Sequence, residues 1–85
     1  MIQGIVLINI ASGLEEEVVS KIKGIPSVSQ VFLVYGTYDA VALVEVDDMG
    51  KLRDVVLGNI RRIKGVLSTT TLIVMESMKG MRQTT

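Results

Sequence analysis

The chain of 85 residues contains neither cysteine nor histidine. The absence of cysteine excludes a disulfide framework, a thiolate nucleophile and a thiolate metal ligand. The absence of histidine removes the commonest general base and the commonest metal ligand. Any chemistry would have to rely on carboxylates, lysines or hydroxyl groups. The composition therefore argues against an ordinary enzyme, and we expect no catalytic residues, no bound metal and no cofactor.

The chain also lacks net charge and long apolar runs. Nine Lys and Arg balance nine Asp and Glu, whereas a nucleic-acid-binding surface needs an excess of basic residues to neutralise phosphates. No apolar run approaches the roughly 18 residues of a membrane span, and the N-terminus lacks the basic segment of a secretion signal. We therefore expect a cytoplasmic protein that binds neither duplex DNA nor a membrane.

The sequence has enough apolar content for one small core. Hydrophobic residues make up 48% of the chain and charged residues 21%, which excludes disorder by composition. A chain of this length has room for a single domain. We assign residues 1–76 to that domain and residues 77–85, which show no periodicity, to a C-terminal tail.

The order of the predicted elements indicates the fold class. Segments rich in β-branched residues predict four strands, at residues 2–10, 28–35, 40–46 and 66–76. Apolar residues at helical spacing predict two helices, at residues 12–24 and about 48–63. The resulting order predicts an α+β protein with the ferredoxin-like βαββαβ sandwich, in which two helices cover one face of a four-stranded antiparallel sheet.

Local signals indicate where the helices begin and end. Ser12 is the predicted N-cap of the first helix, with Glu15 completing a capping box. Gly24 is expected to end that helix in the left-handed conformation. Asp47 or Asp48 is expected to cap the second helix.

Both faces of the predicted sheet are apolar. In the first strand, for example, Ile5 and Leu7 face away from Val6 and Ile8. The helices cover one face, and an apolar patch as large as the other is uncommon on a soluble monomer. We expect a second copy to cover it, sheet on sheet about a two-fold axis. A different partner protein is the less favoured alternative.

Two polar segments interrupt this apolar pattern. Gly36 permits a positive φ, and Asp39 is an acid in an otherwise apolar hairpin. Asp39 either stabilises the turn by accepting hydrogen bonds from backbone N–H groups or binds the ammonium group of a ligand. The hydroxyl run of residues 68–71 is either ordinary strand composition or a set of uncharged ligand-binding groups. If assembly joins the two segments at a subunit boundary, the pair would suit a free amino acid.

The segments GTYDAVALVEV, residues 36–46, and IKGVLSTTTLIV, residues 63–74, carry a family resemblance. With the order of elements, they resemble the effector-binding domain of the leucine-responsive/asparagine (Lrp/AsnC) regulatory family, which is called the RAM domain. The resemblance covers about residues 2–75. It implies dimerisation through the sheets, association of dimers into tetramers or octamers, and an amino-acid effector at the boundary between dimers.

The resemblance also implies which residues bind the effector. In the hairpin they would be Gly36, Thr37, Tyr38 and Asp39, and at the start of the last strand Ser68, Thr69 and Thr70. Full-length relatives carry a DNA-binding helix-turn-helix before this domain, whereas this chain opens on its first strand. We therefore expect a stand-alone domain that acts through a full-length Lrp/AsnC-type regulator or a metabolic enzyme.

Two other functions remain open at this point. A dimeric α+β barrel-type enzyme shares the order of elements and the sheet-to-sheet dimer, but such enzymes often use a histidine. An ACT-like regulatory domain also binds amino acids and has this topology, but it usually pairs its sheets edge to edge. The leading hypothesis is a non-enzymatic domain for amino-acid binding and oligomerisation.

Overall fold

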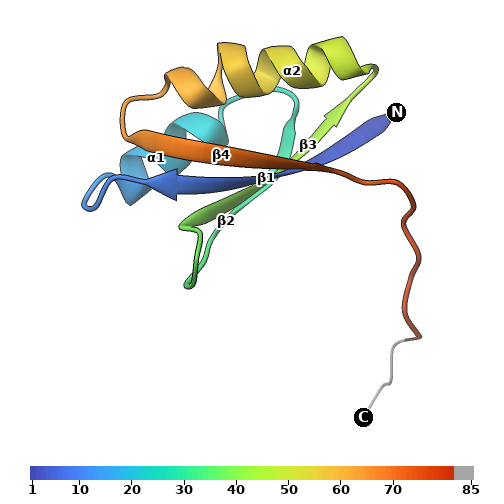
Figure 1. Ribbon diagram of the computed structural model, residues 1–85, viewed down its shortest axis with the longest axis horizontal. Coiled ribbons are helices and arrows are strands. Elements are labelled where there is room, and N and C mark those ends of the chain that lie inside the picture. The colour runs from blue at the N-terminus through green and yellow to red at the C-terminus, as the bar shows by residue number, and fades with distance from the viewer. Residues whose placement is uncertain (82–85) are drawn as a thin grey trace.

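Two helices lie on one face of a four-stranded sheet (Figure 1). The computed structural model describes residues 1–81. The elements are β1 (Ile2–Ile10), α1 (Glu15–Ile22), β2 (Val28–Leu33), β3 (Ala40–Val46), α2 (Met49–Gly58), the short 3₁₀ helix η1 (Ile60–Arg62) and β4 (Val66–Ile73). The strands lie in the order β2-β3-β1-β4, and all neighbours are antiparallel. The predicted α+β class and ferredoxin-like sandwich are confirmed.

Two strands are shorter than predicted. β2 ends at Leu33, and the backbone N–H of Val34 donates to the carbonyl of Asp39 at 3.0 Å across the base of the hairpin loop. β4 ends at Ile73, three residues before the predicted end. Of the predicted C-terminal tail, residues 82–85 lie outside the described part of the chain.

The start of α1 differs from the prediction. The helix begins at Glu15, Leu14 occupies the N-cap position and no side chain caps it, so the predicted Ser12 cap is wrong. Gly13 adopts a φ of +92°, a conformation that glycine reaches without steric cost, and this turn leaves Ser12 outside the helix. The Glu15 carboxylate accepts a hydrogen bond of 3.0 Å from the Gly13 N–H instead.

The end of α1 also differs from the prediction. Gly24 does not have a positive φ. Its N–H donates to the Lys21 carbonyl at 3.2 Å, and the Ile25 N–H donates to the Ile22 carbonyl at 3.0 Å. These short-range bonds continue the helix into tight right-handed turns, so no left-handed residue is needed there.

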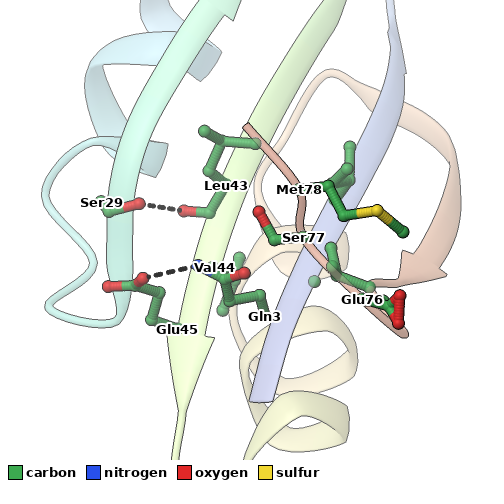
Figure 2. Close-up of a pocket in the computed structure, with 11 residues that line it drawn as sticks. Gln3, Ser29, Leu43, Val44, Glu45, Glu76, Ser77 and Met78 are labelled. Carbon is green, nitrogen blue, oxygen red and sulfur yellow. Dashed lines mark hydrogen bonds between the residues drawn. The ribbon is translucent and has the colours of Figure 1, made fainter. Parts of the chain in front are cut away.

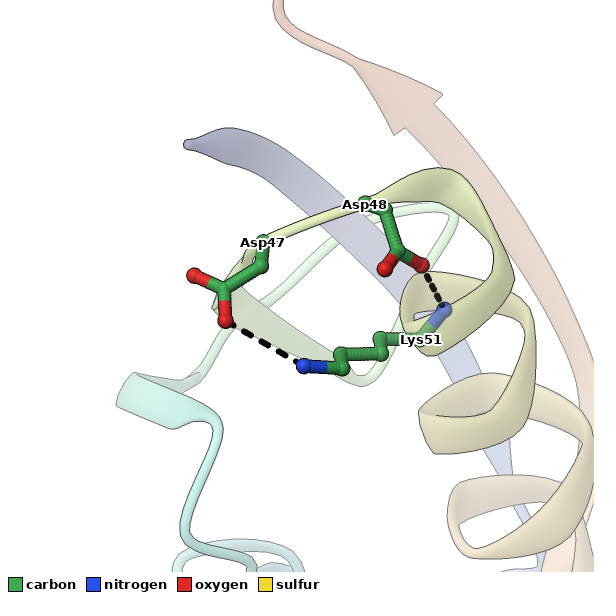
Figure 3. Close-up of polar contacts among 3 residues, drawn as sticks. All are labelled: Asp47, Asp48 and Lys51. Atoms are coloured by element: carbon green, nitrogen blue, oxygen red, sulfur yellow. Dashed lines mark hydrogen bonds and ion pairs between the residues drawn. The ribbon is translucent and has the colours of Figure 1, made fainter.

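The N-terminus of α2 has the predicted cap, but the helix ends early. Oδ1 of Asp48 accepts a hydrogen bond of 2.8 Å from the Lys51 N–H (Figure 3), which confirms the capping prediction. The helix ends at Gly58, and Asn59, with φ −122° and ψ −66°, separates it from η1. Ile60 in η1 is fully buried. The apolar spacing that predicted a longer helix therefore reflects burial, which a 3₁₀ turn also provides.

The core lies between the helices and the inner face of the sheet. Its buried side chains come from β1, β3, α1, α2 and η1, and they are Val6, Ile8, Ile10, Val18, Ile22, Ala40, Ala42, Val44, Val46, Leu52, Val55, Val56 and Ile60. At one close approach, a Cβ at Gly4 would lie 2.9 Å from Cδ1 of Leu52. Burial of these side chains holds the helices on the sheet.

The other face of the sheet, which we call the outer face, has an apolar centre. The register places Ile5 between Leu43 of β3 and Leu72 of β4, and Leu7 beside Val41. Leu72 is 48% exposed, and no helix among the described residues lies on this side (Figure 1). The prediction that both faces are apolar is confirmed.

Polar pairs lie at both ends of the outer face. At one end the Gln3 side chain donates a hydrogen bond of 3.0 Å to Glu45. At the other end the Asn9 side chain donates one of 3.0 Å to Ser68. A polar pair therefore lies beyond each end of the apolar centre, in the direction in which the strands run.

Within residues 1–81, no helix has the length and apolar character needed to cross a membrane.

Candidate functional site

The hairpin between β2 and β3 carries four of the predicted ligand-binding residues. Gly36 adopts a φ of +131°, which glycine alone adopts without strain. Thr37 is exposed, and Tyr38 and Asp39 are half-buried. The hairpin therefore holds Asp39 at the base of an exposed loop, at the first position before β3.

The Asp39 carboxylate has a structural contact. Its Oδ2 accepts a hydrogen bond of 2.7 Å from the backbone N–H of Ile10, and its own N–H donates to the Ile8 carbonyl at 2.9 Å. These contacts give Asp39 a structural role, but they join the hairpin to β1, whereas the turn-stabilising interpretation expected bonds to nearby N–H groups of the turn. Within residues 1–81 no group donates a hydrogen bond to Oδ1, so this oxygen is available to a ligand.

A cavity of about 350 Å³ lies beside this hairpin. Its lining comes from the hairpin and the start of α1, and it consists of Glu15, Leu33, Val34, Tyr35 and Asp39. Two carboxylates and an apolar wall suit a small molecule with an ammonium group and an apolar body. Of the predicted site residues, only Asp39 lines this cavity. Glu15, Leu33, Val34 and Tyr35 also line it but were not among the predicted site residues, although Tyr35 directly precedes the hairpin motif.

The hydroxyl run at the start of β4 is divided between the two faces of the sheet. Ser68 pairs with Asn9, Thr69 with Ile8 and Thr70 with Leu7. Because successive side chains of a strand alternate, Ser68 and Thr70 lie on the outer face and Thr69 on the inner face. Ser68 accepts its hydrogen bond from Asn9, which is a further polar residue near the site that sequence reasoning missed.

The two predicted segments lie at the same end of one sheet. Ile8 of β1 pairs with Ala40, which follows Asp39, on one side and with Thr69 on the other. Neighbouring strands are about 4.8 Å apart, so the segments are separated by about 10 Å across β1. A small ligand that contacts both must lie over the end of β1 or receive one set of groups from another subunit.

A second cavity, of about 450 Å³, lies at the opposite end of the outer face (Figure 2). The chain that follows β4 contributes Glu76, Ser77 and Met78 to it. Ser29, also in its lining, donates a hydrogen bond of 3.2 Å to the Leu43 carbonyl. Because part of this cavity belongs to the outer face, a second copy on that face would alter it.

The described residues offer little for metal or redox chemistry. Within residues 1–81 no three His, Cys, Asp or Glu side chains form a group that could hold a metal ion. The same part of the chain has no buried polar or charged residue. The cavity lined by Glu15 and Asp39, at about 350 Å³, has the size of a small-molecule site.

Comparison with known proteins identifies relatives of the whole chain. Residues 3–84 match the family model described as the Lrp/AsnC ligand binding domain. A protein from Thermus thermophilus with a solved structure is 35% identical, with a TM-score of 0.89, and the match covers 94% of this chain and 100% of that one. A transcriptional regulator from Neisseria meningitidis, solved in complex with L-Met, is 20% identical with a TM-score of 0.85.

The Neisseria regulator, and a further relative, homocitrate synthase, are longer than this chain. The Neisseria match covers 93% of this chain but 53% of the regulator, and at that identity it shows the fold alone. Homocitrate synthase from Sulfurisphaera tokodaii is 38% identical over 61 residues, which is 72% of this chain. This chain spans 13% of the length of that enzyme, so the similarity covers a small part of it.

Proposed function

The chain belongs to the Lrp/AsnC ligand-binding domain family, a regulatory family of effector-binding domains, and we propose that its effector is an amino acid. The cavity beside the β2–β3 hairpin carries this proposal. Glu15 and Asp39 line it with carboxylates, and Leu33, Val34 and Tyr35 supply an apolar wall. A free amino acid offers an ammonium group to the acids and a side chain to the wall.

The remaining predicted site residues complete the proposed site. Gly36, Thr37 and Tyr38 shape the hairpin on one side, and Ser68, Thr69 and Thr70 belong to the other side of β1. Hydroxyl and backbone N–H groups near Ser68 and Thr70 would bind the effector's carboxylate, from the same subunit or from a neighbouring dimer. The regulator from Neisseria meningitidis, solved with L-Met, supports an amino acid as the type of effector.

We further propose that the protein is a homodimer through its outer face and that dimers associate into tetramers or octamers. Ile5, Leu7, Val41, Leu43 and Leu72 form an apolar centre that a second sheet would cover. The polar pairs at both ends of the outer face would lie at the rim of such an interface, where polar groups remain in contact with water. The exposed β2–β3 hairpins would then be free for contact between dimers.

Regulation without catalysis or direct DNA binding is the proposed biochemical role, in the cytoplasm. Within residues 1–81 every buried side chain on the helix-covered face of the sheet is apolar, which disfavours an α+β barrel-type active site. The partner would be a full-length Lrp/AsnC-type regulator. The match to part of homocitrate synthase favours a second candidate, in which the domain modulates a metabolic enzyme.

A thermal-shift screen against the twenty amino acids tests the proposed effector class. A ligand at 100 times its Kd stabilises the native state by about 2.7 kcal/mol, which corresponds to roughly 10–20 °C for a domain of this size. We expect one or a few amino acids to raise the melting temperature, and their decarboxylated amines to do so less. If none of the twenty raises the melting temperature at about 10 mM, well above 100 times a micromolar Kd, the amino-acid proposal fails.

A further inference from the structure

The chain after β4 presents three methionines at a spacing of three residues. Met75, Met78 and Met81 are 97%, 79% and 96% exposed, respectively. The residues between them are polar or lack a side chain, and they are Glu76, Ser77, Lys79 and Gly80. Three of the five methionines of the chain lie in these seven residues. Methionine is apolar and adaptable, so three exposed methionines within one short segment suit packing against a second surface.

This methionine segment, residues 75–81, leaves the sheet on the side of the outer face. The N–H of Val74 donates to the Gln3 carbonyl at 2.9 Å. The chain then runs away from the sheet on the side opposite the helices (Figure 1). Met78 lines the same cavity as Ile5 and Leu43 of the outer face. The segment therefore begins at the rim of the apolar outer face and points away from its own core.

The length of the segment exceeds the thickness of one sheet layer. An extended chain advances about 3.3 Å per residue, so Met81 lies within reach of about 23 Å from Val74. Two stacked sheets are separated by about 10 Å. If a second sheet packs on the outer face, the segment is therefore long enough to reach that second sheet and to extend past it, along the edge of the second sheet.

We propose that the methionine segment clasps the second copy of this chain, with Met75, Met78 and Met81 packed against it. The inference rests on the proposed dimer through the outer face. A second copy is the occupant to which the geometry points, because the segment starts at the rim of the same face that this copy would cover. Two-fold symmetry then gives two reciprocal clasps per dimer.

Serine substitutions in the full-length chain test the clasp. The variant carries Met75→Ser, Met78→Ser and Met81→Ser, and the matched control carries leucine at the same three positions. Sedimentation velocity over a dilution series measures the dimer Kd, and circular dichroism verifies the fold. We expect the serine variant to raise the Kd by about 30-fold, since three apolar contacts are lost, and the leucine control to stay within about threefold of wild type.

A photoreactive methionine analogue placed at position 78 alone tests the contact directly. We expect a cross-linked product of twice the chain mass, and we expect it to disappear in a Leu43→Asp background. A serine variant with the wild-type Kd, or a cross-link only within one chain, overturns the clasp while leaving the dimer intact. A wild-type protein that sediments as a monomer at every concentration overturns the proposed dimer itself, and the clasp with it.

Discussion

Oδ2 of Asp39 accepts a hydrogen bond of 2.7 Å from the backbone N–H of Ile10. Pairing between β1 and β3 ends at Ile8 and Ala40, although β1 continues to Ile10. The N–H of Ile10 therefore has no β3 carbonyl opposite it, and the Asp39 carboxylate takes that place. The same carboxyl group also lines the hairpin cavity, so a structural contact and a proposed binding contact meet in one side chain.

Asp39→Ala should destabilise the free protein because it leaves the N–H of Ile10 without its acceptor. A hydrogen bond to a partly buried charged group contributes about 1–2 kcal/mol. For a domain of this size, the melting temperature should fall by roughly 5–10 °C. Differential scanning calorimetry of wild type and variant at equal protein concentration measures this change. An unchanged melting temperature would show that the hydrogen bond contributes nothing to stability.

Asp39→Asn separates the structural contact from the proposed ligand contact. The amide oxygen of Asn still accepts the hydrogen bond from Ile10, so the melting temperature of the free protein should stay within a few degrees of wild type. The negative charge is lost, so affinity for the best amino acid from the screen should fall by roughly 10- to 100-fold. Isothermal titration measures the affinity. An unchanged affinity removes Asp39 from the site.

Leu43→Asp should convert the proposed dimer into a monomer. Leu43 lies in the apolar centre of the outer face, where a second sheet would bury an unpaired carboxylate at a high cost. Leu57→Asp is the matched control, because Leu57 is 41% exposed on α2, on the helix side of the sheet. Sedimentation equilibrium should show monomer for the first variant and dimer for the second. A dimeric Leu43→Asp protein would contradict assembly through this face.

Gly65→Ala should destabilise the protein more than Gly13→Ala does. Both glycines have a positive φ, +106° for Gly65 and +92° for Gly13, so alanine strains the backbone at either position. A Cβ at Gly65 would also lie 2.9 Å from Cγ2 of Val18, whereas one at Gly13 meets no atom within 4 Å. Urea unfolding should give a difference of at least about 1 kcal/mol between the variants. Equal losses would mean that the α1 contact relaxes without cost.

Asp48→Ala should cost more stability than Asp47→Ala, although the two acids are neighbours. Asp48 caps α2 through the Lys51 N–H, and loss of an N-cap costs about 1 kcal/mol. Among residues 1–81, the Asp47 side chain makes only an exposed ion pair of 3.2 Å with Nζ of Lys51 (Figure 3), which contributes about 0.5 kcal/mol or less. Urea unfolding of both variants at one protein concentration measures the difference. A reversed order would contradict the capping role.

The fold was predictable because the spacing of apolar residues along the sequence indicates which side chains are buried. Ile5 and Leu7 alternate with Val6 and Ile8, and this alternation is enough to place one apolar row on each face of β1. Helix ends were less predictable because they depend on local backbone conformation. The positive φ of Gly13, for example, decides where α1 begins, and a capping motif alone does not reveal it.

The candidate site was only partly predictable. The hairpin motif marked Asp39, but Glu15 is far from it in sequence and lines the same cavity only because α1 begins beside the hairpin. Such a neighbourhood is a tertiary contact, and no local pattern encodes it. The split of Ser68, Thr69 and Thr70 between two faces, in contrast, follows from strand alternation.

The central position of β1 has a consequence for folding. β1 is made first, yet one of its two neighbours is β4, and the pair Ile5–Leu72 joins residues 67 positions apart. Contacts this distant in sequence slow folding, because a long loop must close before they form. During synthesis, the edge of β1 that pairs with β4 stays unpaired until residues 66–73 have been made. We therefore expect the outer face to be complete, and able to meet a second copy, only after β4 has emerged from the ribosome.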